Sequence, residues 1–162
     1  MVGMRILGAV SGSRSQSSEK ASRSSVLEIH FWMPSRIQAI SPLVDRLMLL
    51  IEGSQCIRGE EPDVELALRE ALANAVAHGN EKGQIKVHIR CRCGAGNEIA
   101  IVVADQGKGF DFRNITGDGG PLGPAGGYKH GIQLMKAYMD EVYFERGGSE
   151  VHMRKRRRNR LH

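Results

Sequence analysis

The sequence has little of several features that mark specialised protein classes. Its 162 residues include three cysteines and 5% aromatic residues, and no apolar run approaches the roughly 18 residues that a transmembrane helix needs. The apolar stretch within residues 1–10 is too short for a secretory signal peptide. With 41% hydrophobic and 25% charged residues, the composition is that of one ordinary globular domain, and we expect a soluble, cytoplasmic protein.

The cysteines are odd in number and form no C-x-x-C pair. Cys56, Cys91 and Cys93 therefore favour neither a disulfide framework nor a zinc site. Cys91 and Cys93 alternate with arginines in a β-like run, so we predict that both thiols face inward as small hydrophobic groups.

The net charge of +5 belongs to the two ends of the chain. Residues 1–25 carry four basic and one acidic residue, and residues 154–162 carry six basic and no acidic residues, whereas residues 26–153 carry 13 basic and 17 acidic residues. We expect residues 155–162 to form a solvated basic tail. Such a tail attracts any polyanion, but direct nucleic-acid binding is not expected.

Periodicity indicates where the ordered domain begins and ends. Residues 11–25 contain eight serines and no large apolar side chain, so we expect residues 1–25 to be a disordered leader. Alternating apolar residues from Leu27 to Met33 then predict a strand, and we expect the domain to span residues 26–154.

The patterns predict strands alternating with helices. A helix is expected from Ser41, as a capping hydroxyl, and Pro42 to Gly53. The remaining elements are a helix over residues 61–78, a strand hairpin over 84–93 and 98–104, a helix over 131–138, and a hairpin over 141–145 and 150–154. This order predicts a two-layer α/β sandwich with a mixed, mainly antiparallel sheet and helices on one face.

Residues 106–130 lack periodicity. Residues 117–127 alone contain six glycines and two prolines. A stretch of this length inside a compact domain is a functional lid or a disordered insert.

Three groups of residues could carry chemistry. Glu70, Asn74 and His78 are spaced by four along the second helix and form one polar ridge beside alanines, which a polar helix border would also explain. Asp105, Gly107 and Gly109 follow an apolar strand, where a carboxylate can accept a hydrogen bond from a base, although glycines after a strand also make ordinary turns.

The third group is the glycine-rich segment that leads into the helix at Gly131. Backbone N–H groups at a helix start suit phosphate oxygens, although a flexible linker with a helix cap has the same pattern. His78 fits a structural role at a helix end, and His88, His130 and His152 have no partner in the sequence that suggests a metal.

The three groups together resemble a known nucleotide site. Residues 65–79 are similar to the N box of the GHKL ATPase superfamily, residues 105–109 to its G1 box and residues 126–135 to its G2 box. The E-x-x-x-N-A-x-x-H-G form, the small size and the YMDEV segment at residues 138–142 resemble the anti-sigma factor serine/threonine kinases. The resemblance covers about residues 26–155.

This resemblance implies a Bergerat-type, histidine kinase-like ATPase fold that uses ATP with Mg²⁺. It makes Asn74 the magnesium ligand and Glu70 the general base. For the nucleotide, it makes Asp105 the acceptor for the adenine amino group and adds Gly107, Gly109, Gly127, Gly131 and Ser149 to the binding site. Lys129 stands where a G2 glycine is common, so it would either clamp a phosphate or slow turnover.

The resemblance also implies partners. These are a sigma factor and an anti-anti-sigma (STAS) protein that receives the phosphoryl group, and family members are often homodimers. Two alternatives stay open: a nucleotide-binding regulatory module that transfers no phosphate, and the catalytic domain of a sensor histidine kinase. The serine-rich leader contains no histidine to act as phosphoacceptor, which disfavours the second alternative.

Overall fold

A computed structural model describes residues 3–7, 27–79, 86–94, 97–109 and 126–158, and it leaves the side chains of residues 3–7, 78–79 and 126–129 undescribed. The helices are α1 (Ile40–Ser54), α2 (Glu61–Gly79) and α3 (Gly126–Tyr138). The strands are β1 (Gly3–Leu7), β2 (Leu27–Pro34), β3 (Lys86–Gly94), β4 (Glu98–Ala104), β5 (Glu141–Glu145) and β6 (Glu150–Arg156).

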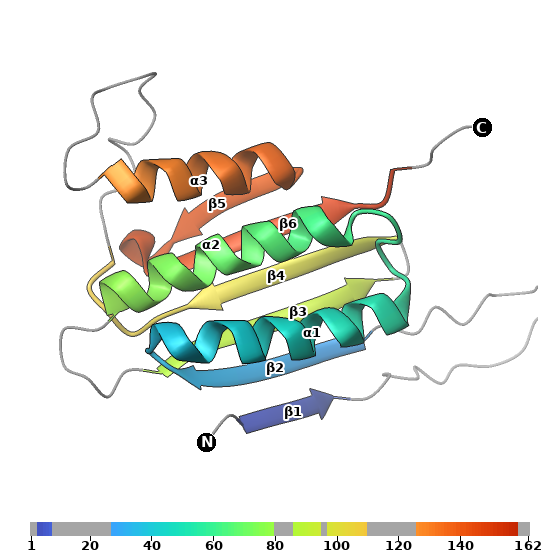
Figure 1. Ribbon diagram of the computed structural model, residues 1–162, viewed down its shortest axis with the longest axis horizontal. Helices are drawn as coiled ribbons and strands as arrows, with labels where there is room; N and C mark the ends of the chain where they lie inside the picture. Colours follow the sequence, from blue (N-terminus) through green and yellow to red (C-terminus); the bar gives the residue numbers. More distant parts are fainter. Residues whose placement is uncertain (1–2, 8–26, 80–85, 95–96, 110–125, 159–162) are drawn as a thin grey trace, which may run out of the picture.

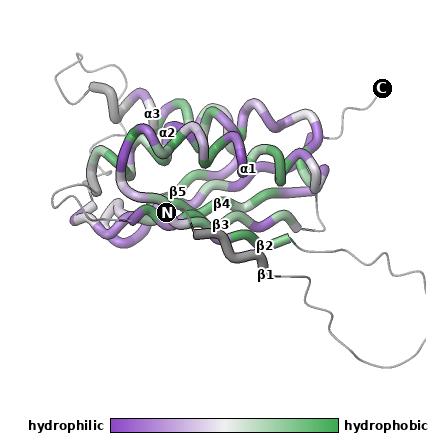
Figure 2. Tube along the Cα trace, turned by 60° about the horizontal axis from the view of Figure 1, so that its bottom comes forward, coloured by the Kyte–Doolittle hydropathy of each residue, from purple (hydrophilic) through white to green (hydrophobic). Residues whose placement is uncertain are grey.

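The six strands form one sheet in the order β1-β2-β3-β4-β6-β5, and each described pairing is antiparallel. The three helices lie together over one face of this sheet (Figures 1 and 2). The prediction of a two-layer α/β sandwich is therefore confirmed, with an antiparallel rather than mixed sheet in the described part of the chain. No described helix has both the length and the apolar character of a membrane span.

The core forms because alternate side chains of each strand face the helices. Phe31, Ile89, Val103 and Val151 pair across β2, β3, β4 and β6 and make one apolar row, and all four are buried. Burial of each such side chain stabilises the fold by about 1.5–3 kcal/mol. The core is thus a single layer between sheet and helices.

The predicted cap of α1 is wrong. The helix begins at Ile40, directly after a 3-10 turn at Ile37–Ala39, and the backbone N–H of Ile40 donates to the carbonyl of Ile37. Because this turn starts the helix, Ser41 is not needed as a cap, and its hydroxyl oxygen instead accepts a hydrogen bond from Arg69 at 3.2 Å. The helix ends at Ser54, one residue beyond Gly53, with Gln55 left-handed at φ 54°.

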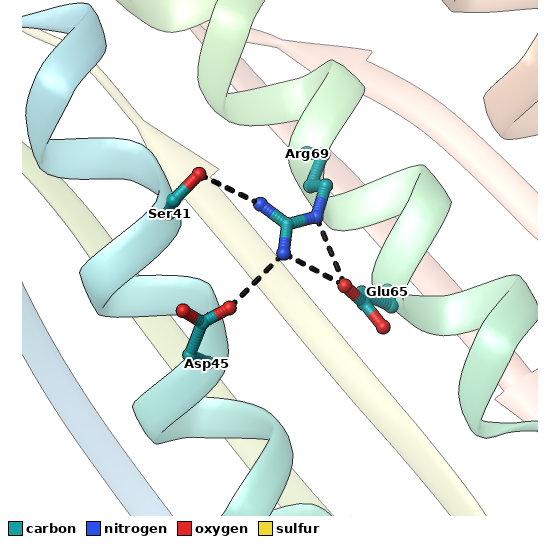
Figure 3. Close-up of polar contacts among 4 residues, drawn as sticks. All are labelled: Ser41, Asp45, Glu65 and Arg69. Atoms are coloured by element: carbon teal, nitrogen blue, oxygen red, sulfur yellow. Dashed lines mark hydrogen bonds and ion pairs between the residues drawn. The ribbon is translucent and has the colours of Figure 1, made fainter.

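Arg69 connects α2 to α1 (Figure 3). Its guanidinium lies 3.1 Å from Asp45 of α1 and 2.7 Å from Glu65, one turn earlier on α2. Together with the bond to Ser41, these contacts fix the turn of α2 that comes directly before Glu70. The two helices are thus joined at the point where the polar ridge begins.

Both expected domain boundaries need correction. Gly3–Leu7, inside the expected disordered leader, forms the edge strand β1, because its backbone pairs with β2; residues 8–26 lie outside the described residues. At the other end β6 continues to Arg156, and Lys155 of the expected basic tail is fully buried. Its ammonium lies 2.7 Å from Asp63 and 3.2 Å from Glu60.

The prediction for the cysteines is also partly wrong. Cys56, just after α1, forms a disulfide with Cys93 at the end of β3, with 5.9 Å between their Cα atoms. The pairing follows from the packing of α1 over β3, which the sequence spacing does not reveal. The predicted inward orientation is confirmed, because Cys91 and Cys93 are both buried, and burial raises the pKa of the Cys91 thiol to about 12.

Candidate functional site

The polar ridge of α2 faces α3 at a glycine. A Cβ atom added to Gly131 would lie 2.7 Å from Oε2 of Glu70 and 3.6 Å from both side-chain polar atoms of Asn74. Any side chain at this position would therefore push against the glutamate. The absence of a side chain at Gly131 lets three of the predicted site residues lie together, although they come from two helices far apart in the sequence.

Asn74 has hydrogen-bonding capacity that the described residues leave unused. Its Nδ2 atom is buried and has no hydrogen-bond partner among them. An unsatisfied buried donor costs about 1–3 kcal/mol, so such a group indicates a partner other than the described residues. A phosphate oxygen is a strong acceptor for an amide N–H, and the carbonyl oxygen of the same side chain can ligate a metal ion.

Asp105 follows β4 and is buried. Its backbone N–H donates to the carbonyl of Ser149 at 2.9 Å, and its Oδ1 accepts a hydrogen bond from the N–H of Gly107 at 2.7 Å. These two bonds hold the strand end against the β5–β6 hairpin and turn the chain after it. The carboxylate is thereby fixed at the end of β4.

Gly109 packs against the same hairpin. Its φ is +71°, and an added Cβ would meet the backbone of Gly147 and lie 2.9 Å from the backbone nitrogen of Ser149. Both the left-handed conformation and the close approach require glycine here. The second glycine of the predicted G1 box therefore serves a packing role that the sequence pattern does not reveal.

Asn74, Asp105 and Ser149 line one pocket between the helices and the sheet. Its remaining walls are mainly apolar and include Ala75, Val103, Met135, Phe144 and Val151. The enclosed space is small, about 10 Å³ or room for roughly one water molecule, so a larger ligand requires these walls to move apart. A few converging polar groups in a mainly apolar pocket suit a planar heterocycle such as a nucleotide base.

The turn between β5 and β6 forms one wall of this pocket, and it contains Ser149, which the family resemblance places in the nucleotide site. Ser149 is buried, and its hydroxyl donates to the carbonyl of Arg146 at 3.0 Å. Gly148 also lines the pocket. The Gly147-Gly148 pair indicates the close approach of Gly109, because adjacent glycines permit a turn that another backbone segment approaches closely.

The start of α3 differs from the prediction. The helix begins at Gly126 rather than Gly131, so Gly127 and Lys129 belong to its first turns. Two glycines disfavour a helix locally, and packing against α2 overrides that preference. The side chain of Lys129 and residues 110–125, which make up most of the expected lid, lie outside the described part of the chain. His130 is exposed.

Comparison with known proteins agrees with this geometry. The family model of the histidine kinase-like ATPase domain matches residues 33–155. A serine-protein kinase RsbW of Oceanobacillus iheyensis is 35% identical over 94 residues, which are 49% of this chain and 54% of that protein. The RsbW protein of Bacillus velezensis is 37% identical to this chain over 92 residues, which are 49% of this chain and 54% of that protein. The RsbW protein of Bacillus subtilis is 34% identical over 95 residues, which are 51% of this chain and 56% of that protein.

The chain thus spans about half the length of the curated relatives it matches. The family match is broader, because it begins in β2, ends in β6 and includes the polar ridge of α2, Asp105 and the α3 glycines. The chain belongs to the histidine kinase-like ATPase domain family.

Proposed function

We propose that this protein is an ATP-dependent serine/threonine kinase that acts as a cytoplasmic anti-sigma factor. It phosphorylates a serine or threonine of an anti-anti-sigma (STAS) protein and also sequesters a sigma factor. The observation that carries the proposal is the contact of Glu70, Asn74 and Gly131 beside a pocket that ends at Asp105. The relatives named serine-protein kinases support a serine side chain as the phosphoryl acceptor.

The pocket holds the adenine of ATP in this proposal. Asp105 accepts from the adenine amino group, Gly107 and Gly109 shape the turn beside the ring, and Ser149 lines the opposite wall. Gly127 lies in the first turn of α3, whose N-terminal N–H groups and positive dipole end favour the phosphates. Gly131 lies one turn further along, where its lack of a side chain leaves room beside Asn74. Lys129 belongs to the same end of this helix, and in this proposal it clamps a phosphate.

Asn74 is the residue that holds Mg²⁺. The unsatisfied Nδ2 atom of Asn74 supports a ligand here, because a bound phosphate oxygen would accept its hydrogen while the carbonyl oxygen faces the ion. Mg²⁺ prefers about six oxygen ligands and takes few of them from protein. One neutral carbonyl therefore binds the ion weakly alone, and we expect Mg²⁺ to arrive with the nucleotide.

Glu70 acts as the general base. Phosphoryl transfer depends mainly on alignment and charge neutralisation, and ATP with Mg²⁺ supplies the activated phosphoryl group when bound. Glu70 lies one helical turn from Asn74, so its carboxylate can accept the proton of the attacking hydroxyl beside the metal ligand. Gly131 allows the carboxylate to occupy this position without a clash.

Partner switching follows from these activities. The kinase holds either the sigma factor or the unphosphorylated STAS protein, in our proposal as a homodimer. Phosphorylation releases the STAS protein, and the kinase then recaptures sigma. Incubation with labelled ATP, Mg²⁺ and STAS proteins of the source organism tests the proposal: phosphoserine or phosphothreonine on the STAS protein supports it, and no transfer despite ATP binding contradicts it.

Lys129 favours one alternative, a regulatory module that binds nucleotide and partners but transfers no phosphate. The lysine replaces a glycine of the G2 box and could restrict movement of the lid. Sigma binding measured with wild-type protein and Glu70→Gln separates the two. In the alternative, ATP and the STAS protein release sigma equally and lastingly from both. A kinase recaptures sigma in the wild type only, because the STAS protein is phosphorylated only there.

A further inference from the structure

A second cluster of polar side chains lies on the β5–β6 hairpin, on the sheet face that the helices leave uncovered. Glu145 pairs with Glu150 across the two strands, and Tyr143 pairs with His152 two residues further along. These residues alternate with Phe144 and Val151, which line the nucleotide pocket on the other face. The cluster therefore lies outside the candidate active site.

The ligand atoms of this cluster converge. Nε2 of His152 lies 2.8 Å from Oε1 of Glu150 and 3.3 Å from Oε2 of Glu145, and the three residues offer ligand atoms that all lie within 4.8 Å of one another. Metal bonds of about 2.0–2.2 Å place neighbouring ligand atoms roughly 2.8–3.6 Å apart in tetrahedral or octahedral sites. The two measured separations lie within this range.

A hydrogen on the His152 ring cannot bond to both carboxylates at once, whereas a metal ion can. Nε2 carries at most one hydrogen, which can point at only one of the two carboxylates. The guanidinium of Arg146 lies 3.6 Å from the other carboxylate oxygen of Glu150. Its positive charge therefore offsets the charge of Glu150 and not that of Glu145. A divalent cation would bond to Nε2 and to both carboxylates at once.

The cluster is also held in place before any ion binds. The ring of Tyr143 stacks on the ring of His152, with 4.6 Å between centroids and 11° between planes. The side chains of His152 and Glu150 are each only 16% exposed, whereas that of Glu145 is 53% exposed. Two ligands are therefore fixed on a strand, and the third closes the site from the solvent side.

We propose that Glu145, Glu150 and His152 form a binding site for a divalent transition-metal ion, of which Zn²⁺ is the representative. An imidazole nitrogen with two carboxylates suits Zn²⁺ and its neighbours, whereas Mg²⁺ and Ca²⁺ prefer oxygen ligands. This site is independent of the nucleotide and of the Mg²⁺ proposed at Asn74. The ion ties both strands of the hairpin together and stabilises it.

Isothermal titration calorimetry with Zn²⁺ tests the site, using the full chain without a histidine tag, without nucleotide and after treatment with a chelator. We expect saturable binding of one ion per chain and a rise in the thermal unfolding temperature. His152→Ala should abolish both effects. Glu145→Gln, at the most exposed ligand, should keep the fold by circular dichroism and weaken binding by about tenfold or more.

His88→Ala is the matched control, because His88 lies on the same sheet face and forms a hydrogen bond with His30 at 3.1 Å. It should bind Zn²⁺ like the wild type. Absence of saturable binding overturns the proposal. So does binding that survives His152→Ala, or binding that His88→Ala abolishes, since the ion would then occupy the pair of histidines on β2 and β3.

Discussion

Gly131 of α3 lies against the carboxylate of Glu70 of α2, so closely that an added Cβ would be 2.7 Å from Oε2. The same Cβ would be 3.6 Å from Asn74. The glycine thus determines where the carboxylate lies relative to the proposed metal ligand. The close packing of α3 on α2 at Gly131 therefore sets the geometry of the polar ridge.

Gly131→Ala should reduce phosphoryl transfer without unfolding the protein. The added methyl group meets the flexible end of Glu70 rather than backbone, so it displaces the carboxylate at little cost in stability. A misplacement of about 1 Å can lower a rate by about 100-fold. Turnover and thermal unfolding, measured on the same preparations, check this prediction.

Gly53→Ala is the matched control. Gly53 lies in α1, and an added Cβ would have nothing within 4 Å. The substitution should leave turnover unchanged and stabilise the helix by about 0.5–1 kcal/mol. Equal turnover in Gly131→Ala and Gly53→Ala would refute the role given to the contact with Glu70.

Gly109→Ala should destabilise the fold and weaken nucleotide binding together. The new Cβ would overlap the backbone of Gly147 and would require a left-handed alanine, so the wall of the pocket must move. Gly147→Ala separates these effects, because it has a similar φ of +67° but open space around the added Cβ.

The strain alone should cost about 1–2 kcal/mol in Gly147→Ala, and Gly109→Ala should cost more. Urea unfolding of both variants measures the difference. Equal losses in the two variants would show that the packing of Gly109 on the hairpin contributes nothing.

Periodic elements could be predicted from the sequence, because their signal is local. The amphipathic pattern over residues 61–78 and the alternation over residues 98–104 correspond to α2 and β4. The start of α3 could not be predicted, because its glycines oppose a helix and only packing against α2 stabilises it. The burial of Lys155 could not be predicted either, because the residue stands in a run of arginines. Its side chain is buried because it continues the alternation of buried residues along β6.

In the candidate site too, residue types and local spacing could be predicted, whereas contacts between distant segments could not. The sequence indicates Glu70, Asn74 and Asp105 as residue types with suitable spacing, and the structure brings Glu70 and Asn74 to Gly131 and puts Asp105 in a pocket with Asn74. Their roles stay predictions. The contact of Gly109 with the β5–β6 turn depends on tertiary packing, and no spacing within the sequence encodes it.

Asp105→Asn should weaken ATP binding while preserving the fold. The amide oxygen can still accept the hydrogen bond from Gly107, but the group loses its charge. Hydrogen bonds to charged groups contribute about 1.5–3 kcal/mol, so we expect a loss of affinity of about 10-fold or more.

Calorimetry with ATP measures the effect of Asp105→Asn. Asp140→Asn is the control, because Asp140 is exposed and accepts a hydrogen bond from the backbone of Arg156 outside the pocket. ATP affinity that is unchanged in Asp105→Asn would exclude this carboxylate from base recognition.

Lys155→Met should destabilise the protein strongly at neutral pH. The ammonium is buried, bonds to Asp63 and Glu60, and donates to the carbonyl of Tyr138 at 2.6 Å. Removing one partner from a buried ion pair typically costs about 3–5 kcal/mol. Lys136→Met, at an exposed position of α3, should change stability little.

The same lysine predicts a pH dependence. Burial alone lowers the pKa of Lys155, but hydrogen bonds to Asp63 and Glu60 outweigh burial, and the net pKa is raised. Its stabilisation is therefore complete below the ordinary value of about 10.5 and is lost as the pH rises through the folded-state pKa. The difference in unfolding free energy between wild type and Lys155→Met should stay constant from pH 8 to about pH 10 and shrink above the ordinary value of about 10.5; a difference that does not shrink there would contradict the ion-pair account.

The most direct test of the central claim is the single-turnover rate of phosphoryl transfer to a STAS protein at saturating ATP and Mg²⁺, compared between wild type and Glu70→Gln. The account predicts that the variant binds ATP with the affinity of the wild type and transfers phosphate at least about 100-fold more slowly. Equal transfer rates, or no transfer by the wild type despite saturated ATP binding, would contradict it.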